Sequence, residues 1–176
     1  HFCGVAGIKP TYGRVSRRGV APLAYSLDHC GPLAWTAHDC ALVMQAVAGF
    51  DPADPGSADR SVPDYAAALD GDLKGVRIGV IRHFYDGDDN ADSVVKGAMD
   101  GALAAFAGMG ATVEDVSLSP LQDFHACGMT IMLSEAFAIH EPVLKTTPEK
   151  YGEIFRDRMM ISGLLTSADY VQALRM

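Results

Sequence analysis

The hydrophobic and polar positions of this 176-residue chain follow different patterns in successive stretches. In the first stretch, residues 1–35, short apolar runs are separated again and again by glycine or proline. A segment interrupted so often does not form a long helix. The pattern therefore predicts two buried strands, at 5–10 and 33–36, joined by turns.

A helical pattern follows. Thr36 is placed to cap its N-terminus, Asp39 lies in the first turn, and Gly49 ends it. The residues at helical spacing predict the face turned toward the core: Leu42, Val43, Ala46 and Val47. The stretch after it, residues 50–65, is rich in Asp, Pro and Ser and is expected to be a loop that is functional or packed rather than disordered.

The middle of the chain has a strand–helix–strand pattern. A β-branched run at 75–81 predicts a buried strand, and a polar loop is expected at 84–92. Apolar residues at helical spacing predict a helix at 93–107, and alternation predicts a strand at 111–118. This order is typical of a βαβ unit in an α/β protein.

Beyond Pro120 the sequence becomes mainly helical, and a last helix is expected to begin with Ser167 as its cap. We found no internal repeat in the sequence. The predicted organisation is one partial domain over 1–176, with an α/β portion at 1–120 and a mainly helical portion at 121–176.

The charge of the chain argues against a nucleic-acid partner. Acidic residues outnumber basic ones by 22 to 14, which gives a net charge of −8, whereas phosphate binding depends on Lys and Arg. The one basic cluster comprises Arg14, Arg17 and Arg18. Two interpretations of it stay open at this point, a solvated loop and an anion site.

The four cysteines, Cys3, Cys30, Cys40 and Cys127, form no Cys-x-x-Cys pair and are too sparse for a disulfide scaffold. Buried free thiols in a reducing cytoplasm are the expectation. The sequence contains no signal peptide and no apolar run long enough to span a bilayer. We therefore expect a cytoplasmic protein without a membrane partner.

No group of residues has the spacing of a catalytic or metal site. The six histidines are scattered, so neither a metal nor another cofactor is predicted. No serine lies in a Gly-x-Ser-x-Gly elbow. Cys3 lies in an apolar run without a neighbouring cation, which favours a packed thiol over a reactive one. Glu135 and His140, five residues apart on a predicted helix, are expected on different sides of it.

Two blocks near the N-terminus resemble the amidase signature family. The first is FCGVAGIKPTYGRVSRRGV at 2–20, and the second is SLDHCGP at 26–32. The loop GFDPADPGSA at 49–58 is also similar. Four residues match the family's Ser-x-Asp-x-x-Gly-Pro pattern in the second block: Ser26, Asp28, Gly31 and Pro32. The similarity weakens after 120 but extends over the whole chain.

The resemblance implies a large α/β/α fold around a mixed central sheet, incomplete in this chain. It also implies hydrolysis of a non-peptide carboxamide to a carboxylate and ammonia or an amine by a Ser–cis-Ser–Lys triad. In the family the nucleophilic serine precedes the first block. The resemblance therefore puts all three catalytic residues upstream of His1 and none in this chain, and the chain by itself is expected to be an inactive fragment.

The resemblance leaves supporting roles for residues of this chain. Gly4 would allow close packing beneath the nucleophile loop. Asp28 would hold that loop, or the arginine of the family's Gly-Ser-Ile-Arg segment, by a charge-assisted hydrogen bond. The alternative is that Asp28 caps the turn at 26–28. Lys9 and Tyr12 are expected to be structural.

Several functional alternatives stay open. The A subunit of glutamyl-tRNA amidotransferase carries an Asn-Leu-x-Arg run after its Glu-Ala, but here Glu135-Ala136 precedes a different sequence. This favours a general amidase and puts the amidotransferase second. A protein of another class, a scaffold without activity, is the third. Residues 129–137 and 159–165 would line an acyl pocket or pack in the core. The expected partners are a small amide substrate, the N-terminal half of the same polypeptide and, as an option, a second copy in a homodimer.

Overall fold

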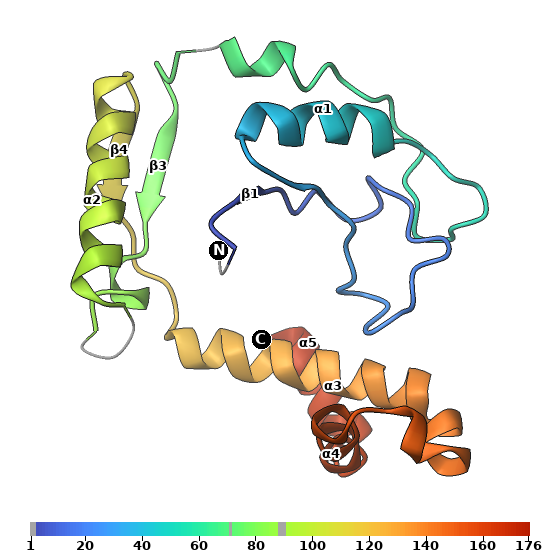
Figure 1. Cartoon of the computed structure of the whole chain (residues 1–176). Helices are drawn as coiled ribbons and strands as arrows, with labels where there is room; N and C mark the ends of the chain where they lie inside the picture. Colours follow the sequence, from blue (N-terminus) through green and yellow to red (C-terminus); the bar gives the residue numbers. More distant parts are fainter. Residues whose placement is uncertain (1–2, 71, 88–90) are drawn as a thin grey trace. The chain divides into compact units, whose positions relative to one another are not determined.

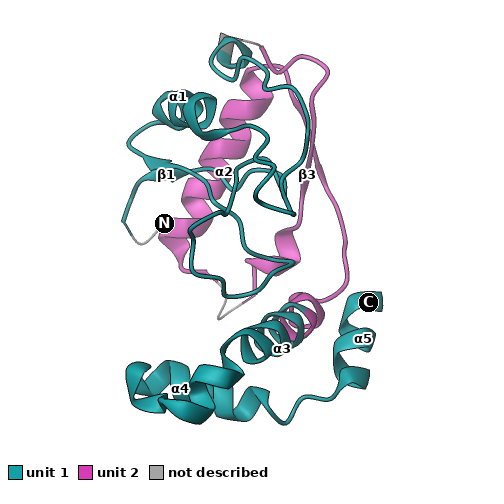
Figure 2. Ribbon diagram, turned by 90° about the vertical axis from the view of Figure 1, so that its right-hand side faces the viewer, with its two compact units in different colours: residues 1–69, 128–176 teal, residues 70–127 magenta. Residues whose placement is uncertain are grey.

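The computed structural model describes residues 3–70, 72–87 and 91–176. It contains two compact units, coloured separately in Figure 2. Unit 1 combines His1–Leu69 with Gly128–Met176, and unit 2 is the continuous segment Asp70–Cys127. Within the described ranges, no helix has both the length and the apolar character needed to cross a membrane.

The first part of unit 1 contains a small antiparallel sheet. β1 (Ala6–Gly7) pairs with β2 (Leu33–Ala34), and Figure 1 shows β1 near α1. Both strands were predicted, but each has only two residues, and the prediction that they are buried is wrong. Leu33, for example, is 78% exposed, because neighbouring side chains cover only part of this short ribbon.

Gly31 explains how the chain enters β2. A Cβ atom at this position would lie 2.0 Å from the carbonyl oxygen of Ile8 and 2.8 Å from the Pro10 ring. Only glycine fits so close to another backbone segment. Next to this close approach, the Ile8 N–H donates a hydrogen bond to the Pro32 carbonyl oxygen at 3.0 Å.

α1 (Ala37–Val47) begins with the predicted capping box, in which Thr36 and Asp39 bond to each other's backbone. The predicted core face is wrong. The buried residues are Cys40, Ala41 and Met44, and the residues expected inside are exposed: Leu42, Val43, Ala46 and Val47. Apolar residues surround most of this helix, so periodicity alone did not determine which side contacts β1 and β2.

Unit 2 is the predicted βαβ unit. β3 (Arg77–Val80) pairs in parallel with β4 (Thr112–Asp115), and α2 (Ser93–Gly108) connects them and packs on the pair (Figure 1). A short 3-10 helix, η2 (Arg82–Phe84), follows β3. The polar loop expected at 84–92 falls partly outside the described residues. α2 has no fully buried residue among those described.

The helical region after Pro120 is confirmed. α3 (Leu121–Thr146) runs from unit 2 into unit 1, followed by three shorter elements: η3 (Pro148–Lys150), α4 (Glu153–Ser162) and α5 (Ser167–Arg175). Ala136, Leu144 and Met159 form its buried core, packed against Leu133, Tyr151 and Phe155. The cap of α5 is Thr166, one residue before the predicted Ser167, because Thr166 completes a capping box with Asp169.

The remaining short helix, η1 (Ala67–Asp70), follows the long loop after α1. The loop itself, expected at 50–65, contains no helix or strand. The chain therefore mixes helices with one parallel and one antiparallel strand pair. This composition agrees with the predicted α/β class.

Candidate functional site

Asp28 closes a turn in the second block. Its Oδ2 atom accepts hydrogen bonds from the N–H groups of Leu23, at 2.9 Å, and Ala24, at 3.1 Å. Its own N–H donates to the Ala24 oxygen at 2.8 Å. The carboxylate thereby fixes the backbone of 23–28, and these contacts leave Oδ1 unused. These hydrogen bonds show that Asp28 caps the turn. A role of Asp28 toward a nucleophile loop stays a prediction.

Gly4 has a backbone φ of +63°, in the left-handed region that favours glycine. A Cβ atom placed there would meet nothing within 4 Å among the described residues. In this chain Gly4 is therefore required for its backbone conformation, and the expected packing beneath the upstream nucleophile loop stays a prediction. Gly4 and Asp28 take part in separate contacts, and the structure does not join them.

Two of the three arginines of the basic cluster are structural anchors. Arg14 donates from Nε to the Tyr65 hydroxyl at 2.7 Å, and its two other nitrogens reach the carbonyl oxygens of Arg60 and Ser61. Arg17 stacks on the Tyr12 ring, 4.6 Å from its centroid, and donates to the Tyr25 oxygen. Both side chains are therefore held by specific contacts of the loop, and the choice between a solvated loop and an anion site stays open.

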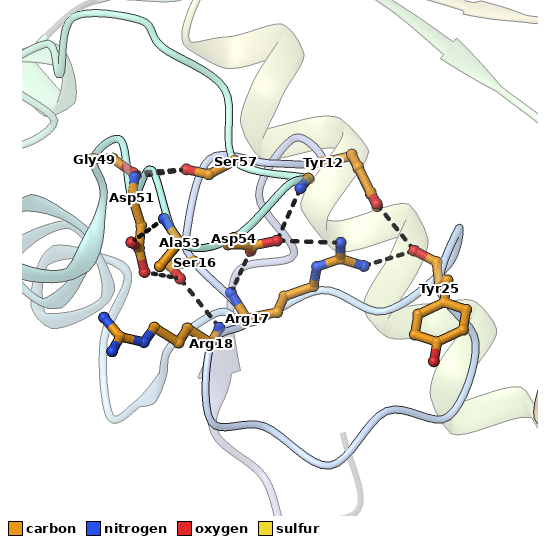
Figure 3. Close-up of polar contacts among 11 residues, drawn as sticks. Tyr12, Ser16, Arg17, Arg18, Tyr25, Gly49, Asp51, Ala53, Asp54 and Ser57 are labelled. Carbon is orange, nitrogen blue, oxygen red and sulfur yellow. Dashed lines mark hydrogen bonds and ion pairs between the residues drawn. The ribbon is translucent and has the colours of Figure 1, made fainter. Parts of the chain in front are cut away.

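The loop that follows α1 is held by two aspartates, shown in Figure 3. Asp54 is buried and accepts from the Arg17 N–H at 2.7 Å and from the Gly56 N–H at 2.9 Å. Asp51 accepts from the Ser16 hydroxyl at 2.7 Å and from the Ala53 N–H at 2.9 Å.

These hydrogen bonds favour the ionised carboxylates. The pKa of Asp54 is lowered mainly by the hydrogen bond from the backbone N–H of Arg17 and next by the one from Gly56. The pKa of Asp51 is lowered mainly by the hydrogen bond from the Ser16 hydroxyl. The loop at 49–58 and the segment at 12–17 therefore form one hydrogen-bonded body. Tyr12 contributes to it through its hydroxyl, which donates to the Tyr25 oxygen at 3.0 Å.

Glu135 joins the second block to the helical region. It accepts from the Ser26 N–H at 2.9 Å, from the Ser26 hydroxyl at 2.6 Å and from the Tyr170 hydroxyl at 2.9 Å. Partial burial raises the pKa of Glu135, but the bonds from Ser26 and Tyr170 outweigh it, and the net shift is downward. The pKa of Tyr170 is raised because its hydroxyl donates to this carboxylate.

His140 makes a second link between the same segments. Its Nε2 lies 3.0 Å from the Pro22 carbonyl oxygen, and its Nδ1 lies 3.0 Å from the Tyr151 hydroxyl. Because a carbonyl oxygen only accepts, Nε2 carries the donated hydrogen in this contact. Glu135 and His140 bond different groups, but both reach residues 22–26. Sequence reasoning missed this convergence. The expected placement of Glu135 and His140 on different sides of the helix stays a prediction.

These contacts organise backbone rather than carry out chemistry. In the ranges that the structure describes, no group of three or more His, Cys, Asp or Glu side chains could hold a metal ion. All four cysteines are free thiols, but only Cys40 is buried. Cys3 is exposed, so the expectation that it is packed is wrong in this chain. His1, from which the expected position of the triad was counted, lies outside the described residues.

The family model named Amidase matches residues 1–175. The chain belongs to the amidase family. The family expected from the two N-terminal blocks is thereby confirmed, and with it the enzyme class of its relatives.

Two curated relatives show how far the similarity extends along the sequence. An amidase of Pseudomonas putida is 39% identical over 175 residues, which cover 99% of this chain and 37% of that protein. The A subunit of the glutamyl-tRNA(Gln) amidotransferase of Geobacter metallireducens is 38% identical over 190 aligned positions, with 97% and 39% of the two chains covered.

A solved structure comes from work on a vestigial protein complex and the evolutionary origins of an s-triazine catabolic enzyme. It is 34% identical, has a TM-score of 0.87 and covers 98% of this chain and 36% of that one. This similarity confirms the α/β fold of the family. The chain thus spans little more than a third of the length of the proteins it matches.

Proposed function

We propose that the polypeptide carrying this amidase-family chain hydrolyses a small carboxamide to a carboxylate and ammonia or an amine. The observation that carries this proposal is the match to an amidase over 99% of the chain at 39% identity. The reaction needs no metal or organic cofactor in this mechanism, because the nucleophile is a serine hydroxyl.

The catalytic triad, Ser–cis-Ser–Lys, would come from polypeptide outside these 176 residues. In such a triad a neutral lysine removes the serine proton through the bridging serine, and backbone N–H groups stabilise the oxyanion. The chain covers 37% of its amidase relative, which leaves room for these residues elsewhere in the protein. A cytoplasmic location fits the four free cysteines.

In this proposal Asp28 and Gly4 support the catalytic segment and do not react. Asp28 holds the turn at 23–28 through Oδ2, and its second oxygen is available for a donor from a neighbouring segment. Gly4 provides the left-handed turn that begins the first block. Tests on these residues belong after the triad itself has been located.

The second candidate is the A subunit of a glutamyl-tRNA amidotransferase. The 38% identity to such a protein favours it, but that alignment needs 190 positions for a chain of 176 residues. The amidotransferase protein therefore carries residues that this chain lacks, whereas the amidase aligns over 175. The length of the alignment therefore favours a general amidase over the amidotransferase subunit.

The test begins with the coding sequence that precedes His1. We expect a Gly/Ser-rich segment with the nucleophilic serine and, before it, the lysine. The encoded polypeptide should release ammonia from simple carboxamides, and Ala in place of that serine should abolish the activity. The 176-residue chain alone serves as the inactive control.

Each alternative predicts a different result. Ammonia release from glutamine alone, and only in the presence of further subunits, would indicate the amidotransferase. A polypeptide without a serine and lysine at those places, and without ammonia release, would leave a scaffold protein.

A further inference from the structure

A pocket of about 350 Å³ lies beside Glu135. Its walls come from the middle of α3, from the end of α4, from the segment after it and from α5, so every wall belongs to unit 1. Its size falls within the range of small-molecule sites.

The only charge at neutral pH on the pocket wall is the carboxylate of Glu135, because the other described lining residues are apolar, hydroxyl-bearing or the neutral Tyr170. Oε1 of Glu135 already accepts two hydrogen bonds and Oε2 accepts one. Each carboxylate oxygen can accept two. Among the contacts of the described residues, one acceptor position on Oε2 is therefore left, next to a negative charge that no basic side chain of the pocket offsets.

Ser134 adds a second group that lacks a partner. Its Oγ is buried and makes no hydrogen bond in the structure. A serine inside a helix can bond to the carbonyl four residues earlier, and Ser162, on the same pocket wall, does so, with Oγ 2.7 Å from the Arg158 oxygen. A buried hydroxyl without a partner is costly, so Ser134 is a group that a bound ligand would satisfy.

The rest of the wall suits an apolar body beside a cation. Phe137 and Tyr170 both line the pocket, as do Ala138 and Leu165, and aromatic faces attract ammonium groups. The Phe137 ring occupies space that Gly163 leaves open, since a Cβ on Gly163 would lie 3.0 Å from it. The ring is thus held in place from the α4 side.

We propose that this pocket binds a small primary ammonium ion attached to an apolar body, with the ammonium group donating to Glu135 Oε2 and Ser134 Oγ. A carboxylate ligand would meet the charge of Glu135 with repulsion, and a neutral alcohol would gain no ion pair. The inference goes beyond amide hydrolysis, because binding uses no residue of the catalytic triad.

The test is isothermal titration calorimetry of the 176-residue chain with three probes of one shape: benzylamine, benzyl alcohol and benzoate. Benzylamine, protonated at neutral pH as lysine is, should bind at least about tenfold more tightly than the alcohol, equivalent to about 1.4 kcal/mol. Benzoate should not bind. Ser134→Ala should weaken benzylamine binding, and Glu135→Gln should remove the preference for amine over alcohol.

Matched controls are Ser119→Ala and Glu149→Gln, two exposed positions that do not line the pocket, which should leave all three titrations unchanged. Far-UV circular dichroism checks that each variant is folded. If Glu135→Gln unfolds, Ser134→Ala decides the result. Equal binding of amine and benzoate, no effect of Ser134→Ala, or an unfolded parent chain would each overturn the proposal. Amidase activity is not needed for any of these readouts, so failure here and failure of the proposed function remain distinguishable.

Discussion

Ser26 donates two hydrogen bonds to Glu135, one from its N–H and one from its hydroxyl, although 109 positions separate the two residues in the sequence. The pair joins the second family block to α3. Tyr170 donates to the same carboxylate, so α5 is tied to this point as well. The turn that contains Asp28 is therefore tied to α3 directly and to α5 through Glu135.

Ser26→Ala should loosen this connection. It removes the hydroxyl donor and keeps the N–H donor, so we expect a loss of about 1 kcal/mol or less, because the pair is partly solvated. The measurement is amide hydrogen exchange at residue 26 together with urea unfolding. Ser119→Ala, at an exposed loop position, is the control. Unchanged exchange at residue 26 would contradict the bond as described.

Acid should weaken unit 1 in a defined range. Four carboxylates have lowered pKa values, with 3.8 as the ordinary value for Asp and 4.5 for Glu: Asp51, Asp54, Glu135 and Asp169. Their contribution to stability is complete above these ordinary values and is lost as the pH falls through the lowered ones. We therefore expect the free energy of unfolding to fall below about pH 4.5.

The contribution of one carboxylate can be isolated by substitution. Asp54→Asn should reduce the slope of stability against pH in this acid range, because Asp54 accepts from Arg17 and Gly56. Asp59→Asn, at an exposed position in the same loop, should leave the slope as it is. The readout is urea unfolding at a series of pH values. Identical slopes for the two variants would refute this assignment.

The same chemical change should have opposite effects at two glycines. Gly31→Ala would push a methyl group onto the Ile8 carbonyl oxygen and should destabilise the chain by about 3 kcal/mol. Gly101→Ala lies within α2 with open space around it and should stabilise by about 0.5–1 kcal/mol. Thermal unfolding measures both. A stabilising Gly31→Ala would show that the close approach of the two backbone segments is not real.

The exposed side of α1 should bind a hydrophobic dye. Leu42, Val43 and Val47 of α1 are all exposed, and Trp35 before the helix is 80% exposed. We expect dye fluorescence and concentration-dependent association of the chain. Val43→Lys with Val47→Glu should reduce both without unfolding, whereas absence of dye binding by the parent chain would count against an uncovered face.

The sequence predicted the order and type of the elements well where local signals were strong. The Thr36–Asp39 capping box and the βαβ pattern of unit 2 are examples, because each depends on residues close together in the chain. It failed for the inner face of α1, because apolar residues lie on several sides of that helix. Which side is covered depends on β1 and β2, and no helical period contains that information.

The site was predicted only in part for a similar reason. Asp28 and Ser26 were identified from the resemblance, but Asp28 bonds to neighbours in the sequence and Ser26 to a distant residue. Leu23 and Ala24 are neighbours of Asp28, whereas Glu135 reaches Ser26 from another region of the chain. A carboxylate on a helix gives no sequence signal for a serine so distant. The role of Arg17 was missed likewise, because Asp54 follows it by 37 positions.

The division of the chain has a consequence for synthesis on the ribosome. Unit 2 is continuous, and its parallel strands are connected by one helix, so it can fold as soon as residue 127 has left the exit tunnel. Unit 1 cannot, since Ser26 and Pro22 must wait for Glu135 and His140 to be made. During that interval residues 22–26 lack their partners on α3 and stay exposed, although β1, β2 and α1 can already pack together. Slowing translation after residue 127 should prolong that exposed state.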